Sequence, residues 1–236
     1  MEFCIRTESW ALREPFVIAR ETMLALPLVH LTIIHAGFAG YAEAAGVDYR
    51  GETPESMTAE IRSYLDGRDT PPSRMELLRD LPPGGARNAI DCALWDWEAK
   101  NAGVKASRLA GFDALKPLDT AYTLSIAAPH DMAASALLAP KGALLKLKLG
   151  GKDGLDLDRV AAVRAAAPDR RLVVDVNQGW SRADLIQAAP ALAALDVELI
   201  EQPLPIGEDG WLRDYHSRQC RRHGGYSRPT SSDAFA

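Results

Sequence analysis

The second half of the chain repeats one unit, an apolar run of strand length followed by an alanine- and leucine-rich segment of helical length. The expected strands are 120–126, 144–149, 171–176 and 197–200, and the expected helices are 129–138, 155–167 and 182–195. Such alternation is typical of a parallel sheet or barrel. Polar residues at the strand ends repeat as well, since Thr123, Lys148, Asp175 and Glu201 follow one another at intervals of 25, 27 and 26 residues.

A closed barrel of this kind needs eight strand–helix units. At about 26 residues a unit, eight units beginning at Asp119 would end near residue 327, whereas the chain has 236 residues. We therefore predict an α/β fold in which residues 116–210 form an incomplete (β/α) TIM-type barrel with about four of the eight strands.

Residues 1–115 have a different pattern and predict an α+β capping domain. The expected strands are 3–12, 29–36 and 40–45. A helix is expected to begin after Thr53, with Pro54 at its first position, and to end at Gly67. The strongest helical periodicity covers residues 86–102 and ends before a glycine.

Residues 211–236 break the pattern and predict an aberrant or disordered tail. This segment contains no Val, Ile or Met, one leucine (Leu212) and five arginines. Such a composition cannot continue a packed core. The abrupt change indicates a shifted reading frame or a premature stop in the coding sequence.

Composition narrows the class of partner. The net charge of -5 comes without a basic stripe interleaved with aromatic residues, so no nucleic-acid partner is expected. No apolar run approaches the roughly 18 residues of a membrane span, so no membrane partner is expected either. The three cysteines are odd in number and far apart, which argues against a disulfide framework and favours a cytoplasmic location. A small-molecule substrate is the default partner.

Two lysines share one face of the strand 144–149. Lys146 and Lys148 are two residues apart, with Leu145, Leu147 and Leu149 on the other face. A Lys-x-Lys pair alone is usually a solvated strand edge. The apolar partners and the repeat favour an interior position, where crowding of like charges is expected to depress a lysine pKa and make the amine a usable base.

Two carboxylates close the next two strands. Asp175 and Glu201 each follow an apolar run, at the rim where barrel strands carry catalytic residues. Carboxylate oxygens from adjacent strands suit Mg²⁺. The alternative is that each acid caps a helix or forms a surface ion pair, but two acids in successive units after a lysine pair favour a site.

The segments Lys146-Leu-Lys148, Asp175-Val-Asn177 and Glu201-Gln202-Pro203, in this order and spacing, resemble the enolase superfamily, muconate-lactonizing subgroup. Residues 15–20 and 86–96 are similar to the dipeptide epimerases within it, typified by L-Ala-D/L-Glu epimerase. The resemblance covers residues 2–210. It implies a capping domain with a (β/α)₇β barrel, and Mg²⁺-dependent removal of a substrate α-proton to give an enediolate.

The resemblance also implies roles for individual residues. Lys148 is the expected general base, and Lys146 tunes it and helps to hold the substrate carboxylate. Asp175 and Glu201 are the expected Mg²⁺ ligands. Asn177 is expected to contact these ligands and hold them in place without binding the metal itself.

Two further residues are implied as substrate contacts, namely Thr123 at the first barrel strand and Met23 in the loop 19–25. Met23 stands where a cationic residue could pair with an acidic side chain of a substrate, so a glutamate dipeptide is only the default substrate. An N-acylamino acid is the other expected substrate class, and full-length relatives are expected to be homo-oligomers.

Two departures from the family pattern bear on activity. The third metal carboxylate should lie about 25 residues beyond Glu201, but Tyr226 and Ser227 stand there. The second lysine, on a later strand, has no counterpart. We therefore predict that this polypeptide alone is inactive as a two-base epimerase.

Several alternatives remain open. Within the subgroup they are N-acylamino-acid racemisation, muconate cycloisomerisation and a dehydration. From another class, the chain is a non-catalytic remnant, or it assembles with a partner that supplies the other barrel half.

Overall fold

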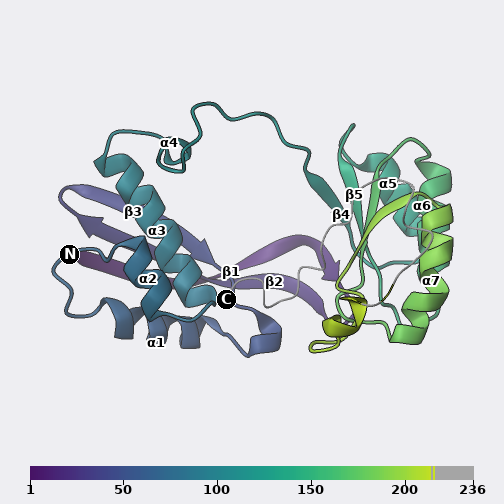
Figure 1. Ribbon diagram of the computed structural model, residues 1–236, viewed down its shortest axis with the longest axis horizontal. Helices are drawn as coiled ribbons and strands as arrows, with labels where there is room; N and C mark the ends of the chain where they lie inside the picture. Colours follow the sequence, from purple (N-terminus) through teal and green to yellow (C-terminus); the bar gives the residue numbers. More distant parts are fainter. Residues whose placement is uncertain (214, 216–236) are drawn as a thin grey trace. The chain divides into compact units, whose positions relative to one another are not determined.

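The computed structural model describes residues 1–213 and Tyr215, which fall into two compact units (Figure 1). The first unit comprises Met1–Leu12 and Ala25–Pro117. The second comprises Arg13–Leu24 and the described residues from Leu118 onward. Each unit has its own hydrophobic core.

The sheet of the first unit has the order β1-β2-β3. Its strands are β1 (Glu2–Val17), β2 (Thr22–His35) and β3 (Phe38–Ala44). β2 and β3 are antiparallel. Along β2, Val29, Leu31 and Ile33 are fully buried while the residues between them are half-buried, as strand alternation requires.

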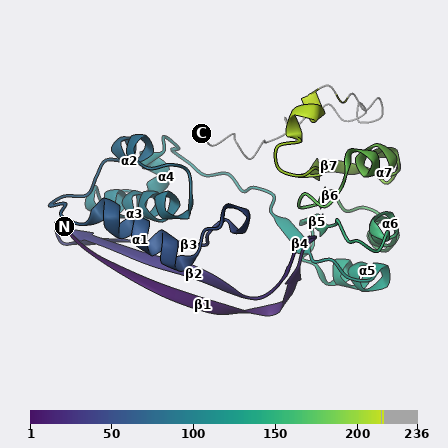
Figure 2. The same ribbon diagram turned by 90° about the horizontal axis from the view of Figure 1, so that it is seen from below.

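Helices cover one side of this sheet (Figure 2). They are η1 (Asp48–Arg50), α1 (Pro54–Leu65), α2 (Arg74–Asp80), α3 (Gly85–Asn101) and α4 (Ala106–Leu109). α3 lies directly on β3, because a Cβ placed on Gly40 would come within 2.1 Å of the Ala93 carbonyl oxygen. Only glycine permits this approach.

The second unit is built on a parallel sheet of order β4-β5-β6-β7. Its strands are β4 (Ala121–Leu124), β5 (Leu144–Lys148), β6 (Leu172–Asp175) and β7 (Val197–Glu201). The helices α5 (Pro129–Leu138), α6 (Asp156–Ala166) and α7 (Arg182–Ala194) lie along one face of it (Figure 2). The predicted fold class is confirmed, with four parallel strands among the described residues.

Two features of the first unit differ from the expectation. β1 and β2 extend to Val17 and from Thr22, so that the ends of both strands enter the second unit. α2 was not expected at all, because it has only seven residues, although Ser73 and Glu76 form a capping box at its start.

The expectation for the tail is wrong at its beginning. η2 (Asp209–Arg213) is helical, and Trp211, Leu212 and Tyr215 pack against the core of the second unit. The rings of Trp211 and Tyr215 stack with their centroids 4.8 Å apart, which explains how so polar a segment still contributes apolar contacts. The rest of the segment 211–236, including Tyr226 and Ser227, lies outside the described residues.

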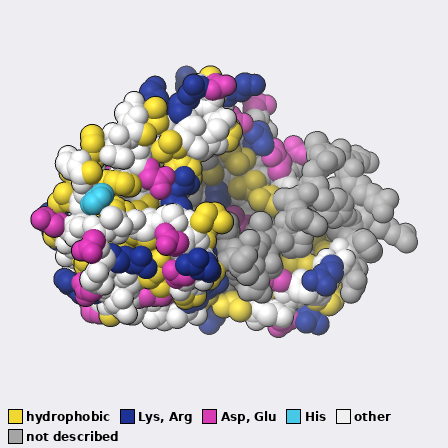
Figure 3. All heavy atoms as spheres, turned by 60° about the vertical axis from the view of Figure 1, so that its left-hand side comes forward, with side chains coloured by type: hydrophobic (Ala, Val, Ile, Leu, Met, Phe, Trp, Pro, Cys, Tyr) yellow, Lys and Arg dark blue, Asp and Glu magenta, His cyan; other side chains and the backbone are white. Residues whose placement is uncertain are grey.

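The surface carries charges of both signs. Figure 3 shows Lys and Arg side chains interspersed with Asp and Glu over the visible face. In the part of the chain that the structure describes, no helix has the length and apolarity needed to cross a membrane.

Candidate active site at the strand ends of the parallel sheet

Strand register brings the predicted polar residues to one edge of the parallel sheet. Lys148 at the end of β5 pairs with Asp175 at the end of β6, and Asp175 pairs with Glu201 at the end of β7. Lys146, two residues earlier in β5, pairs with Thr123 of β4 on its other side. Because parallel strands end at the same edge, the regular spacing in sequence becomes proximity in space.

Charge pairs join four of these side chains. The Lys148 Nζ donates a hydrogen bond to Asp175 Oδ2 at 2.7 Å. The Lys146 Nζ lies 3.0 Å from the same Asp175 oxygen and 2.6 Å from Glu201 Oε2. Asp175 is therefore shared by both lysines, and Lys146 bridges the two carboxylates.

Burial is graded across the cluster. Asp175 is 2% exposed and Lys148 is 7% exposed, whereas the side chains of Lys146 and Glu201 are 21% and 35% exposed. The alternation of β5 produces this arrangement, because Leu145 and its alternate neighbours point into the helix-covered core while the lysines point to the opposite face. The Lys148–Asp175 pair is thus held on a sheet whose other face is fully packed.

The charge pairs perturb two pKa values. Burial alone would lower the pKa of the Lys146 ammonium, but hydrogen bonds to Glu201 and Asp175 outweigh it and raise the pKa above its usual value. Burial alone would raise the pKa of Asp175, but the hydrogen bond from Lys148, assisted by Lys146, holds it below the usual value. The predicted depression of a lysine pKa by crowding is therefore wrong for Lys146, because the neighbouring carboxylates dominate over the like charge.

Asn177, two residues after Asp175, contacts the Asp175 carboxylate. Its backbone N–H donates to Asp175 Oδ1 at 3.0 Å, which fixes the carboxylate from the side away from the lysines. The residue is 8% exposed, and its side-chain Oδ1 is buried without a hydrogen-bond partner among the described residues. Asn177 and Gln178 have φ values of 48° and 68°, the left-handed turn that redirects the chain after β6.

The two predicted substrate contacts are placed less directly. Thr123 is half-buried on the strand next to Lys146. Met23 is half-buried near the start of β2, in the segment Arg13–Leu24 that belongs to the second unit. Their assignment as substrate contacts stays a prediction.

Two contacts with this N-terminal segment were missed. The Phe16 ring centroid lies 5.5 Å from the Lys148 Nζ, in a cation–π arrangement. Arg20 donates a hydrogen bond to Gln178, which follows β6. Both residues belong to the segment 15–20 that carries part of the family resemblance, but nothing in its local pattern gives a contact across so many residues.

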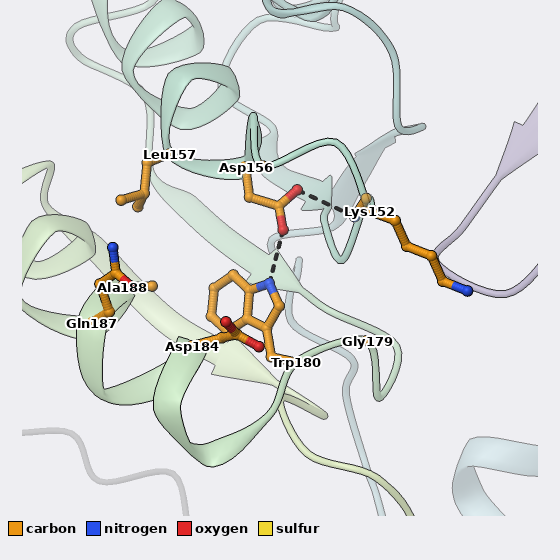
Figure 4. Close-up of a pocket in the computed structure, with 10 residues that line it drawn as sticks. Lys152, Asp156, Leu157, Gly179, Trp180, Asp184, Gln187 and Ala188 are labelled. Atoms are coloured by element: carbon orange, nitrogen blue, oxygen red, sulfur yellow. Dashed lines mark hydrogen bonds between the residues drawn. The ribbon is translucent and has the colours of Figure 1, made fainter.

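A cavity of about 420 Å³ lies between the segments that follow β5 and β6 (Figure 4). Asp156 and Trp180 line it and are hydrogen-bonded to each other, and Lys152 and Asp184 stand at its polar boundary. Neither Asp156 nor Trp180 was predicted as functional, since a lone Asp at a helix start and a lone Trp give no distinctive signal.

The donor set fits part of a magnesium site. Asp175 and Glu201 already converge on one cation, the Lys146 ammonium, and carboxylate oxygens are the ligands that Mg²⁺ prefers. Within residues 1–213 and Tyr215, no group of three or more His, Cys, Asp and Glu side chains could hold a metal ion. These two carboxylates and the nearby amide of Asn177 would therefore supply only some of the ligands.

Family models match both parts of the chain. The mandelate racemase / muconate lactonizing enzyme N-terminal domain matches residues 1–111, and the enolase C-terminal domain-like family matches residues 131–220. The chain belongs to the enolase superfamily. Within this superfamily, the mandelate racemase and muconate lactonizing group provides the matched N-terminal domain.

Relatives with assigned activities include L-Ala-D/L-Glu epimerase of Escherichia coli. It is 37% identical over 210 residues, which cover 88% of this chain and 65% of the epimerase. The chain thus spans slightly less than two thirds of the length of this relative.

Solved structures agree with this assignment. A crystal structure of an enolase family member from Agrobacterium tumefaciens with homology to dipeptide epimerases, which holds sodium and L-Ala-L-Glu, superposes with a TM-score of 0.85 at 39% identity. The match covers 91% of this chain and 65% of that one. A dipeptide epimerase from Cytophaga hutchinsonii in complex with Mg and D-Ala-L-Val matches with a TM-score of 0.79 at 27% identity, covering 89% of this chain and 60% of that one.

Proposed function

We propose that this enolase-superfamily chain carries one face of the site of a dipeptide epimerase, in which Lys148 removes the α-proton of an L-Ala-L-Glu-like substrate. The observation that carries the proposal is the buried contact between Lys148 and Asp175 at the ends of adjacent parallel strands, 2.7 Å long. The buried amine lies on the face of β5 opposite the leucines that fill the core, so packing of that core does not account for its position. The related epimerases named above support the substrate class.

The proposed proton transfer uses Lys148 as base. Its Nζ accepts the α-proton, the carbon–hydrogen bond breaks, and its electron pair moves into the substrate carboxylate. Like any lysine that acts as a general base, Lys148 must be neutral when it accepts the proton.

Lys146 has a complementary role in the proposal. Its ammonium lies on the same strand face as Lys148, two residues away, which suits it to hold a substrate carboxylate while Lys148 accepts the proton. Asp175 and Glu201 would hold Mg²⁺, with Asn177 supporting Asp175. When bound, the metal would stabilise the negative charge that develops on the substrate carboxylate.

The return of a proton to the opposite face of the α-carbon requires a second acid, which the resemblance assigns to a lysine on a later strand. The described residues provide only the face of Lys146 and Lys148. We therefore expect exchange of the α-proton to be the activity of this chain, with inversion as the activity of a complete site.

The experiment is incubation of the purified chain with Mg²⁺ and L-Ala-L-Glu in D₂O, followed by ¹H NMR of the α-proton. We expect slow deuterium incorporation that falls by about 10²- to 10⁴-fold in Lys148→Ala, the usual contribution of a general base. Lys152→Ala is the matched control, because Lys152 is exposed and four residues away.

Two results would contradict the proposal. Exchange that persists in Lys148→Ala would remove Lys148 as the base. No exchange by the wild-type chain, together with no Mg²⁺ binding, would favour the non-catalytic alternative.

A parallel assay with L-Ala-L-Leu tests whether Met23, which carries no charge, favours an apolar side chain in the substrate.

A further inference from the structure

Asp156, at the start of α6, is a buried carboxylate that the proposed proton transfer does not use. It is 8% exposed. Its Oδ2 accepts hydrogen bonds from the Gly150 N–H at 2.9 Å and from the Trp180 indole N–H at 2.8 Å (Figure 4). Its Oδ1 accepts from the Gly151 N–H at 3.3 Å and from the Arg159 guanidinium at 3.1 Å.

Arg159 supplies the matching positive charge and extends the network. It is 3% exposed. Its Nε donates to the Ala127 carbonyl at 2.8 Å, and its Nη1 donates to Asp153 Oδ1 at 2.8 Å. Because a buried ion pair is tolerated only when its remaining polar atoms are satisfied, these bonds fix the geometry of both side chains.

The Asp156–Arg159 pair thereby joins three successive loops at the carboxyl edge of the sheet. Ala127 follows β4, Gly150 and Gly151 follow β5, and Trp180 follows β6. The second and third of these loops leave β5 and β6, the strands whose ends carry the candidate base and its carboxylate. The pair is the common anchor of all three.

The anchor lies close to the candidate base in the chain. Gly150 is two residues after Lys148, and the intervening Leu149 N–H donates to the Asp175 carbonyl at 2.9 Å. A Cβ at Gly150 would come within 2.6 Å of the Val176 carbonyl oxygen. The first residues after β5 and after β6 are therefore in close contact at this point. Displacement of Gly150 would therefore displace Lys148 relative to Asp175.

We propose that Asp156, held by Arg159, is a positioning residue. It fixes the loops that begin after β5 and β6 and so keeps Lys148 in contact with Asp175. The catalytic consequence rests on the proposed function, whereas the structural consequence does not. The neighbouring cavity is not the basis of the proposal, because protein donors already occupy both oxygens of Asp156.

The test compares Asp156→Asn with Asp158→Asn in the full chain. Asp158 is exposed and lies in the same first turn of α6, so its substitution makes the same charge change without touching the network. The readouts are amide hydrogen exchange of Gly150 and Gly151, the ¹³C carboxyl resonance of Asp175, assigned with Asp175→Asn, and kcat and KM for α-proton exchange.

In Asp156→Asn we expect the two glycine amides to exchange about tenfold faster or more, because each loses a hydrogen bond to a charged acceptor. The Asp175 resonance should shift, and kcat should fall by about 10- to 100-fold with little change in KM, as for a misplaced base. Asp158→Asn should match the wild type in every readout.

Faster glycine exchange with an unchanged Asp175 resonance would overturn the proposal, because Asp156 would then stabilise only its own loop. Unchanged glycine exchange would overturn it as well. If the wild-type chain exchanges no α-proton, the proposed function fails, and the glycine amides and the Asp175 resonance alone decide on the positioning role.

Asp156→Asn is a change in a buried network, so its fold is checked by far-ultraviolet circular dichroism. Should it not fold, Trp180→Phe carries the same measurements, since it removes one donor to Asp156 and keeps an aromatic ring. We expect a smaller shift of the Asp175 resonance in the same direction. An unchanged resonance in Trp180→Phe would then overturn the proposal.

Discussion

Gly150 is the residue where the geometry behind the candidate base leaves least room. Its φ is +88°, and a Cβ there would lie 2.6 Å from the Val176 carbonyl oxygen and 2.8 Å from the Ala19 Cβ. Gly150→Ala should therefore combine backbone strain with overpacking. We expect the free energy of unfolding to fall by about 1–2 kcal/mol from the strain and by about 1–3 kcal/mol more from the clash.

Gly142→Ala separates these two contributions. Gly142 has a similar φ of +78°, but a Cβ there would meet nothing within 4 Å. Urea denaturation of both variants should show the smaller loss for Gly142→Ala. Equal losses would mean that the loops after β5 and β6 move apart easily, contrary to the close contact at Gly150.

Asp153 gives the second unit a pH dependence at low pH. The hydrogen bond from Arg159 holds the pKa of Asp153 at about 2, below its ordinary value of 3.8. A depressed folded-state pKa means that the contact stabilises the fold above about pH 4 and that this stabilisation is lost as the pH falls toward about 2. The effect should be modest, because the Asp153 side chain is 46% exposed.

The measurement is the thermal midpoint of the wild type and of Asp153→Asn at several pH values. The wild type should be the more stable at pH 5, and the difference should shrink as the pH falls from about 4 to about 2. Asp169→Asn, at an exposed position, is the control. A difference that stays constant with pH would show that the Arg159 contact does not depend on the charge of Asp153.

At the residue scale, sequence predicted the side chains that lie at strand ends. Lys146, Lys148, Asp175 and Glu201 were predictable because strand alternation and a regular repeat determine both the face and the edge on which they lie. The Arg20–Gln178 hydrogen bond was not, since its partners are 158 residues apart and no local pattern joins them. The raised pKa of Lys146 likewise depends on distances that spacing alone does not give.

At the scale of elements, α7 begins with a capping box that is recognisable in the sequence as Ser181 followed three residues later by Asp184. The Ser181 hydroxyl accepts a hydrogen bond from the Asp184 N–H at 3.2 Å, and Asp184 Oδ2 accepts from the Ser181 N–H at 2.8 Å. Ser181→Ala removes the first bond and leaves a helix N–H without its partner. We expect the free energy of unfolding to fall by about 1 kcal/mol.

Ser135→Ala is the matched control for this prediction. Ser135 lies exposed within α5 of the same unit, where alanine is the better helix former. Chemical denaturation should show a neutral or slightly stabilising effect there. A loss at Ser135 as large as at Ser181 would show that the capping bond is not what stabilises α7.

Elements were predictable where periodicity extended over many residues, as in α3 and the strand–helix repeats. The seven residues of α2 gave too short a window for helical periodicity, although its capping box was present in the sequence. The early part of the expected tail was misjudged for a related reason. Composition showed too few aliphatic residues for a core, but Trp211 and Tyr215 contribute through ring contacts that a count of aliphatic residues does not register.

At the scale of the whole molecule, the candidate site belongs to one of the two units. Every residue of the candidate site belongs to the second unit, including Phe16 and Arg20 from the N-terminal segment Arg13–Leu24. The chain contributes to that unit twice, first through this segment and later through the strands β4 to β7. A family resemblance that begins near the N-terminus is therefore informative about the site even though the barrel strands come much later.

Because each unit has its own core, a substitution that destabilises one core should leave the stability of the other unit unchanged. Leu94 in α3 and Leu147 in β5 are both 0% exposed, and they belong to the core of the first and of the second unit respectively. Leu→Ala at a fully buried site costs about 2–5 kcal/mol. We expect Leu94→Ala to lower the protection of amides in the first unit, and Leu147→Ala to lower it in the second, because each cavity weakens only the core that contains it.

The measurement is native-state hydrogen exchange followed by mass spectrometry of peptides from each unit. Leu138→Ala is the control, since Leu138 is 85% exposed and the same truncation there removes little packing. A loss of protection in both units from either core variant would contradict the prediction. It would mean that the chain unfolds as one cooperative unit, so that the candidate site depends on the stability of the whole chain and not on that of the parallel sheet alone.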